Sequence, residues 1–227
     1  MIKEIIDRLN NELPATVKLV AVSKFHPFNS IDEAYKAGQR IFAESRPQEL
    51  KAKVERLEEL RLERGEPEYM SDIEWHFIGH LQTNKLKMVL PYVALVQSVD
   101  SLRLLEAINE WGIANNKVIS VLLEPHVAAE ETKQGFAPEE ILDIVSRASE
   151  FTNICFKGIM GMATFTDDES VIRSDFSRLQ KVYSTARTVL GPDFSELSIG
   201  MSDDYSIATE YGSTMVRIGS MIFGERG

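Results

Sequence analysis

Lys24 is the residue of this sequence best placed to react with an aldehyde or a ketone. It ends the segment Lys18-Leu-Val-Ala-Val-Ser-Lys24, a β-branched apolar run that is typical of a buried strand. An amine at the end of such a strand loses part of its hydration, which lowers its pKa and makes it a nucleophile that can form a Schiff base. The competing interpretation is a solvated lysine, and the segment alone leaves both open.

Two later segments are suited to binding a phosphate. Ser198-Ile-Gly-Met-Ser-Asp-Asp204 passes from a predicted strand into the start of a predicted helix, where free amides attract an anion. Arg217-Ile-Gly-Ser220 combines a glycine, which permits close backbone approach, with a hydroxyl donor. The simpler interpretation makes Ser202 a helix N-cap, with two aspartates favouring the helix dipole, and Gly219 a turn.

The remaining reactive side chains do not form a recognisable metal site. His76 and His80 have helical metal-pair spacing, but Trp75-His-Phe-Ile-Gly79 predicts a strand and no third ligand is apparent. The single cysteine, Cys155, excludes an internal disulfide and a cysteine-based zinc site. Because its surroundings are apolar, we expect it to be a small core residue.

The composition argues against nucleic-acid and membrane proteins. The 25 Lys and Arg against 35 Asp and Glu give a net charge of −10, whereas nucleic-acid binding depends on neutralising phosphates. We find no apolar run long enough to span a bilayer, and the first residues carry charges where a signal peptide has an apolar block. We therefore expect a cytoplasmic protein without a membrane partner.

Strands and helices alternate along the chain. The predicted strands are Lys18–Lys24, Arg40–Ser45, Glu74–Gly79, Val93–Val99, Lys117–Glu124, Cys155–Met162, Glu196–Gly200 and Met215–Ser220. Each leads into a helix or a short turn, which is typical of a parallel sheet covered on both faces. Eight such units predict an α/β fold, a single (β/α)8 TIM-type barrel over residues 1–227, with a doubly wound open sheet as the alternative.

Several further expectations follow from this pattern. An extra helix carries Ile2, Ile5, Ile6 and Leu9, and little chain follows the last strand. We therefore expect this helix to cover the seam between strands eight and one. Ser30-Ile-Asp-Glu33 has the pattern of a capping box and predicts a helix start. Barrel active sites lie at the carboxyl ends of the strands, which would bring Lys24 and both phosphate-type segments together.

At this point the sequence resembles the pyridoxal phosphate homeostasis protein family, whose fold is similar to the N-terminal domain of alanine racemase. The resemblance covers nearly the whole chain. It rests on Leu19-Val-Ala-Val-Ser-Lys24, Trp75-His-Phe-Ile-Gly79 with Leu81-Gln-Thr-Asn-Lys85, Ser98-Val-Asp-Ser101, Gly158-Ile-Met-Gly-Met162, Leu197-Ser-Ile-Gly-Met-Ser-Asp-Asp204, and Gly212-Ser-Thr-Met-Val-Arg-Ile-Gly-Ser220 with Ile222-Phe-Gly224.

The resemblance implies a fold-type III barrel that carries pyridoxal 5′-phosphate on Lys24 as an internal aldimine. It places the pyridine nitrogen against Arg217 and implies a phosphate site formed by Ser198, Met201, Ser202, Gly219 and Ser220. Two positions depart from the family pattern. Ser45 stands near the ring where the family usually has asparagine, and His80 stands where it usually has proline.

The resemblance implies a cofactor-binding protein in intracellular vitamin B6 and amino-acid balance, with no settled reaction. Apo-enzymes that use the cofactor and amino acids are candidate partners, and we expect a monomer. An arginine does not release its proton to the pyridine ring, so we expect weak activation of the ring. Racemisation also needs a second base, which barrel racemases take from a separate C-terminal domain, and this sequence ends at Gly227, right after the last predicted strand. The alternatives are an amino-acid racemase and a Schiff-base aldolase acting on a sugar phosphate.

Overall fold

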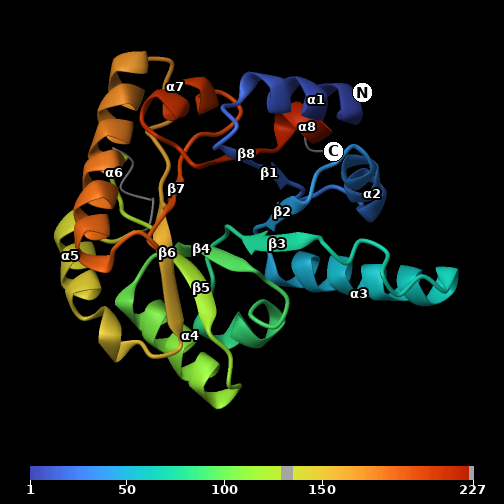
Figure 1. Ribbon diagram of the computed structural model, residues 1–227, viewed down its shortest axis with the longest axis horizontal. Helices are drawn as coiled ribbons and strands as arrows, with labels where there is room; N and C mark the ends of the chain where they lie inside the picture. The colour runs from blue at the N-terminus through green and yellow to red at the C-terminus, as the bar shows by residue number, and fades with distance from the viewer. Residues whose placement is uncertain (129–134, 225–227) are drawn as a thin grey trace.

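Eight parallel strands close into a barrel (Figure 1). The structure is a computed structural model that describes residues 1–128 and 135–224. The strands are β1 Lys18–Val22, β2 Ile41–Glu44, β3 Glu74–Phe77, β4 Leu95–Val99, β5 Ile119–Leu123, β6 Ile154–Met160, β7 Glu196–Ser198 and β8 Met215–Ile218. Each strand pairs with its neighbours in the sequence, and β1 pairs with β8. This closure confirms the barrel and excludes the open sheet.

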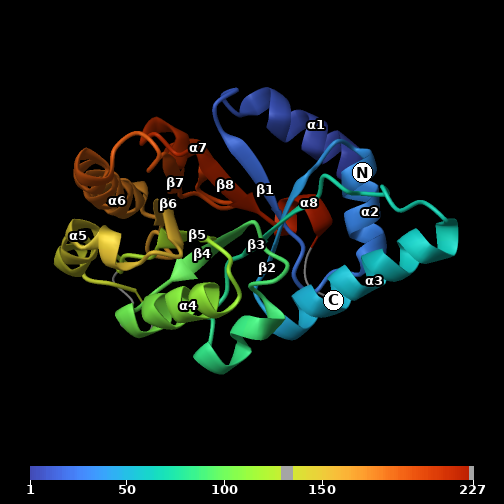
Figure 2. The ribbon, with the colours of Figure 1, turned by 60° about the horizontal axis from the view of Figure 1, so that its bottom comes forward.

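The helices surround the barrel (Figure 2). They are α1 Ile2–Glu12, α2 Phe28–Lys36, α3 Pro47–Arg64, α4 Leu102–Ala114, α5 Pro138–Ser146, α6 Glu169–Leu190, α7 Tyr205–Glu210 and α8 Ser220–Phe223, with 3₁₀ helices at Thr83–Met88 and Ala148–Glu150. Within the described ranges, none of these helices has the length and apolar character needed to cross a membrane.

The apolar side chains form an inner and an outer core. Inside the barrel, Val20, Val22, Leu122, Met160 and Met215 pack together. Their neighbours along the strands point outward against the helices, because successive side chains of a strand face opposite sides. Because the apolar side chains pack within these two cores, polar side chains can occupy the carboxyl ends of the strands.

Helix α1 covers the seam of the barrel, as the sequence predicted. It packs against α2, which follows β1, and against α8, which follows β8 (Figure 1). Ile6 and Leu9 are fully buried there. The Tyr205 hydroxyl donates to the Glu12 carboxylate at 2.7 Å, which ties α7 to the end of α1.

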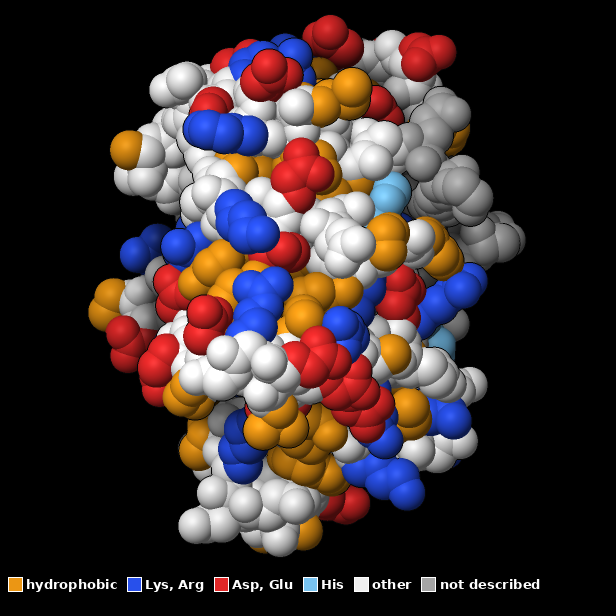
Figure 3. All heavy atoms as spheres, turned by 90° about the vertical axis from the view of Figure 1, so that its right-hand side faces the viewer, with side chains coloured by type: hydrophobic (Ala, Val, Ile, Leu, Met, Phe, Trp, Pro, Cys, Tyr) orange, Lys and Arg blue, Asp and Glu red, His pale blue; other side chains and the backbone are white. Residues whose placement is uncertain are grey.

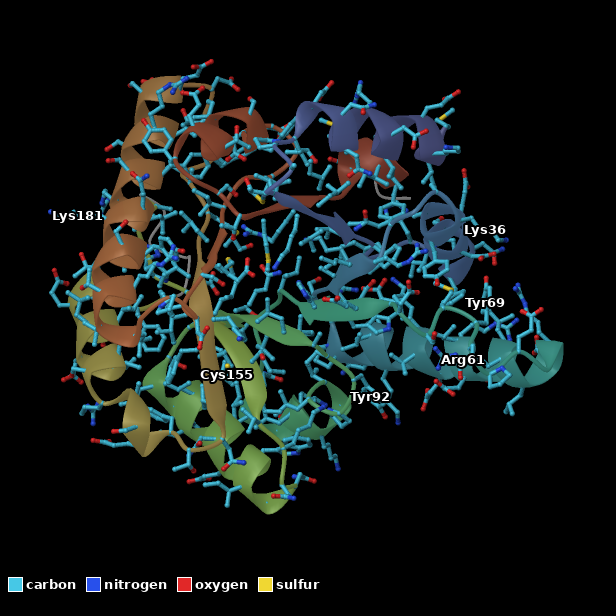
Figure 4. All side chains as sticks on the ribbon, in the orientation of Figure 1. Lys36, Arg61, Tyr69, Tyr92, Cys155 and Lys181 are labelled. Atoms are coloured by element: carbon cyan, nitrogen blue, oxygen red, sulfur yellow. The ribbon has the colours of Figure 1, made fainter. Side chains whose placement is uncertain are left out.

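Charged and aromatic side chains join α2 to the segment that follows α3. Arg61 Nε donates to the Tyr69 carbonyl at 2.8 Å, and the Tyr69 hydroxyl donates to Asp32 (Figure 4). Lys36 pairs with the same Asp32 at 2.8 Å. On this side of the molecule, basic and acidic side chains are interspersed with hydrophobic ones (Figure 3).

Two helix starts and one core assignment differ from the sequence expectations. Helix α2 begins at Phe28 after an extended Pro27, so the predicted capping box at Ser30 lies inside the helix. Helix α7 begins at Tyr205, with Asp204 in the N-cap position, so Ser202 is not its cap. Cys155 lies in β6 (Figure 4) and is only half-buried rather than a core residue.

Candidate functional site

The carboxyl ends of the strands surround a cavity of about 300 Å³. Its lining includes six of the eight predicted site residues, which are Lys24, Met201, Ser202, Arg217, Gly219 and Ser220. Apolar surface comes from Val22, Ile78, Met160 and Met162. The barrel therefore gathers residues that are almost two hundred positions apart in the chain, as the rule for such barrels requires.

The other two predicted residues, Ser45 and Ser198, do not line this cavity. Ser198 is fully buried, where its hydroxyl donates to Gln97 Oε1 at 2.7 Å and accepts from Arg217 at 2.8 Å. The Ser45 backbone packs so closely on Gly79 that a Cβ there would lie 2.0 Å from the Ser45 carbonyl oxygen. The structure therefore does not bring these two serines into the cavity lining, and their contact with a ligand stays a prediction.

A buried ion pair fixes the chain just before Lys24. The Lys53 ammonium donates to the Ser23 carbonyl at 2.8 Å and to Glu44 Oε1 at 2.7 Å. The Ser23 hydroxyl donates to the same carboxylate oxygen at 2.6 Å. Burial raises the pKa of Glu44, and the Lys53 charge opposes this rise. The network holds Ser23, the last residue before Lys24, at its carbonyl and at its hydroxyl.

The chain just after Lys24 is also fixed. The Phe25 N–H donates to Glu49 Oε1, and Lys53 reaches that same oxygen at 2.9 Å. Phe25 has φ of +68°, a left-handed conformation that a residue with a side chain rarely adopts. Since both neighbours of Lys24 bond to one network, we infer that the network sets the direction of the Lys24 side chain.

Arg217 reaches the cavity from inside the barrel. Its guanidinium donates to the Ser198 carbonyl at 2.7 Å, the Ser198 hydroxyl at 2.8 Å and the Gly161 carbonyl at 2.9 Å. Burial lowers its pKa to about 10, while Glu124 and Asp204 oppose the shift. Arg217 is therefore a cation at neutral pH, and two of its five N–H donors stay available to a ligand.

Arg217 is the first member of a hydrogen-bonded chain through the barrel interior. It donates to Ser198, Ser198 donates to Gln97, and Gln97 Nε2 donates to His76 Nδ1 at 2.8 Å. Burial, with help from the nearby Lys18 charge, lowers the pKa of His76 to about 3. His76 is thus neutral, and because Nδ1 accepts, its ring proton is on Nε2.

The turn after β7 brings hydroxyls to the cavity, and one of its amides is already used. Asp204 accepts the Met201 N–H at 2.6 Å, so this amide is not free for a ligand, although Met201 lines the cavity. The Ser202 and Ser220 hydroxyls lie 3.2 Å apart at the cavity wall. Asp203 also lines the cavity, so the described lining carries two cations, Lys24 and Arg217, against one carboxylate.

Acidic groups lie at the ends of β4 and β5. Burial raises the pKa of Glu124 to about 7; Arg217 opposes this rise and Asp100 adds to it. His80 Nδ1 lies 2.8 Å from Asp100 Oδ2, so the histidine that departs from the family pattern has an acidic partner. Across residues 1–128 and 135–224, we find no cluster of three or more His, Cys, Asp or Glu that could hold a metal ion.

Comparisons with known proteins agree with this geometry. A model of the alanine racemase N-terminal domain matches residues 1–227. The pyridoxal phosphate homeostasis protein of Aquifex aeolicus is 36% identical over 209 residues, covering 92% of this chain and 87% of that protein. The protein of the same name from Haemophilus influenzae is 35% identical over 212 residues, 93% and 86% of the two chains. The chain belongs to the pyridoxal phosphate homeostasis protein family.

Solved structures include a relative whose fold closely matches this chain. PipY of Synechococcus elongatus, solved with PLP bound, is 30% identical and superposes with a TM-score of 0.86, covering 99% of this chain and 100% of that one. An alanine racemase of Clostridium difficile has a TM-score of 0.76 at 15% identity and covers 99% of this chain and 56% of that one, a likeness of fold alone.

The sequence reasoning missed the residues that support the site from behind. Lys53 lies on a helix rich in charges, a pattern that suggested a solvated face, yet its side chain is 8% exposed. Gln97 lies within the buried strand β4. A polar residue inside a buried strand is the one available signal, because such a group must find a partner.

Proposed function

We propose that this protein binds pyridoxal 5′-phosphate covalently through Lys24 and holds it in reserve, serving cofactor homeostasis rather than turnover. The observation that carries the proposal is a single cavity lined by the Lys24 amine, the Arg217 guanidinium and the Ser202 and Ser220 hydroxyls. Family membership and the cofactor reported for the PipY structure support it.

The residues of the cavity fit this cofactor. An aldehyde requires an amine, which Lys24 supplies, and an aromatic ring requires apolar surface, which Ile78 and Met160 supply. A phosphate of about −1.5 to −2 charge requires donors and positive charge. The paired hydroxyls provide the donors, and a Cβ on Gly219 would lie 3.0 Å from the Val22 carbonyl, so an added methyl would be tightly packed there.

The protein groups favour holding the cofactor over using it. When bound, the cofactor supplies an aldehyde for reversible capture by an amine and a ring that can withdraw electrons. Arg217 faces the cavity as a cation with a pKa of about 10, so it donates hydrogen bonds but does not hand over a proton near neutral pH. A ring nitrogen beside such a donor stays unprotonated and withdraws electrons weakly. We therefore propose weak catalysis.

Absorbance and borohydride trapping test the binding proposal. The purified protein loaded with pyridoxal phosphate should show a visible band, and borohydride should fix the cofactor to Lys24, as located by peptide mass. Lys24→Ala should lose both, while Lys36→Ala, which removes an exposed lysine paired with Asp32, should keep both. Trapping at another lysine would show that the assignment of Lys24 is wrong.

Hydrogen exchange at the α-carbon of added amino acids tests the proposal of weak catalysis. In deuterated water the loaded protein should exchange this hydrogen far more slowly than typical enzymes, which turn over on the order of 1 to 1,000 times per second. Exchange at enzymatic rates would instead support the racemase.

The finer parts of the role are proposals as well. We propose that the protein acts as a monomer in the cytoplasm and that apo-enzymes receive the cofactor. When the loaded protein is mixed with an apo-enzyme, the activity of that enzyme should return faster than spontaneous release of pyridoxal phosphate into buffer allows. Equal rates would show that the protein only stores the cofactor.

A further inference from the structure

The amino ends of the strands surround a second cavity, of about 210 Å³, at the opposite end of the barrel from Lys24. Its charged lining residues are Lys18, Glu74, Lys157 and Glu196, and the buried His76 also lines it. Three of the charged residues are the first residues of their strands, so they form the rim of the cavity. We call this the basal cavity.

His76 presents a hydrogen-bond donor to the basal cavity. The ring is 3% exposed, and its Nδ1 accepts from Gln97 at 2.8 Å, which leaves the proton on Nε2. Within residues 1–128 and 135–224, no side chain or carbonyl accepts from Nε2. Nε2 is not among the buried polar atoms without a partner, so it is open to the cavity, where a bound acceptor can take the place of water.

The rim of the basal cavity carries both signs of charge. Lys18 pairs with Glu196 at 2.5 Å, whereas Lys157 and Glu74 have no side-chain partner in the described part of the chain. Two cations and two carboxylates leave this lining electrically neutral. A molecule with a single charge could pair with only one of Lys157 and Glu74, whereas a zwitterion could pair with both.

The volume of the basal cavity limits the size of its ligand. At about 30 Å³ for each water in the liquid, 210 Å³ corresponds to roughly seven water volumes. Drug-sized ligands occupy pockets of about 300–1,000 Å³, so a smaller molecule is required. Ile41, Leu95 and Met215 also line the cavity and offer a short apolar surface.

We propose that the basal cavity binds a small zwitterion of the α-amino-acid class. Its carboxylate accepts from His76 Nε2 and approaches Lys157, and its ammonium group approaches Glu74. The hydrogen bonds from Arg217 to Ser198, Gln97 and His76 all donate in one direction, so an acceptor at Nε2 strengthens the whole chain. The ligand thereby acts on the guanidinium at the other cavity.

Nitrogen NMR of the His76 ring tests the proposal on the full chain as purified. Glycine is the probe, and acetate and methylamine each carry one of its two charges. The Nε2 signal should shift saturably with glycine, and both single-charge probes should bind at least about tenfold more weakly. Lys24→Ala should give the same result, since this variant cannot form a covalent link with glycine at the first cavity.

Rim variants locate the site without disturbing the core. Lys157→Ala and Glu74→Gln should each weaken glycine binding by about fivefold or more, while Lys87→Ala, which removes an exposed lysine of the 3₁₀ helix Thr83–Met88, should not. A flat His76 response up to glycine on the order of 10 mM would show that the cavity holds water only. Binding that both rim variants leave unchanged, or that Lys24→Ala abolishes, would equally overturn the proposal.

Discussion

Replacing Lys53 by methionine should destabilise this protein strongly, although Lys53 lies on a charged helix. The ammonium makes hydrogen bonds to Ser23, Glu44 and Glu49, and Glu44 is fully buried. The second oxygen of Glu44 has no partner in the described part of the chain, so Lys53 and Ser23 bear the whole stabilisation of this carboxylate. Methionine keeps an unbranched side chain, one atom shorter than lysine, and removes its charge and donors.

The expected loss follows from the burial of the pair. Removing one partner of a buried ion pair costs about 3–5 kcal/mol, because the other charge is left uncompensated. In a chain of 227 residues, 1 kcal/mol lowers Tm by roughly 2–4 °C, so Lys53→Met should lower Tm by about 6–20 °C. Lys51→Met is the matched control, since Lys51 pairs with Glu55 at 3.4 Å in solvent, and it should cost at most about 0.5 kcal/mol.

The pH dependence separates a lost charge from lost packing. Burial already raises the pKa of Glu44, and removing Lys53 raises it further. A carboxyl with a raised folded-state pKa binds more protons in the folded state, so it lowers stability as pH rises from its unfolded value through its folded value. The Tm loss should therefore be larger near about pH 8 than near about pH 4.

A second substitution and the control variant make this reasoning refutable by thermal scanning. Adding Glu44→Gln to Lys53→Met should recover part of the loss, because a neutral amide needs no counter-charge. Equal Tm values for Lys53→Met and Lys51→Met, or a loss that does not change with pH, would refute it.

Three further predictions concern the barrel and its cavity. Because burial raises the pKa of Glu124 to about 7, stability should fall by on the order of 3 kcal/mol between about pH 4 and 8, and denaturation of Glu124→Gln should show a flatter profile. Gly79→Ala places a Cβ 2.0 Å from the Ser45 carbonyl and should lower Tm far more than Gly65→Ala, where no atom lies within 4 Å and the strain comes from the left-handed φ of +66°; similar losses would contradict this. Pyridoxal without its phosphate should bind at least about tenfold more weakly in absorbance titrations, since charge-assisted bonds to the hydroxyls are lost; equal affinity would argue against a phosphate site.

The barrel could be predicted because each strand is a short apolar run followed by a turn. The strand ends were less predictable, as β7 stops at Ser198 whereas the pattern extended it to Gly200. Beyond Ser198 the Gly200 carbonyl still accepts the Arg217 N–H at 2.9 Å, but Gly200 has a left-handed φ of +97°, so the regular strand geometry is lost there. Helix α2 begins earlier than expected because an extended Pro27 precedes it, which outweighs the capping pattern at Ser30.

The cavity could be predicted in part for the same reason. Once the barrel is assumed, Lys24 and Arg217 must meet at one end. Their supports could not be predicted, because the partner of each is distant in sequence. Gln97 bonds to Ser198, 101 positions away, and Lys53 bonds to Ser23, 30 positions away. Charge and polarity alone did not show that these side chains point inward.

Arg217 also joins three strands where the barrel ladder is shortest. The pairing of β7 with β8 is registered at Ser198 and Met215, and the guanidinium of Arg217 bonds to a carbonyl after β6 and to one at the end of β7. This seam is where local opening of the barrel should begin. A ligand held by Arg217 in the closed form lowers the population of opened molecules by mass action. Amide protons along β8 should thus exchange with solvent more slowly when the cavity is filled. Their exchange rate would therefore depend on the concentration of ligand.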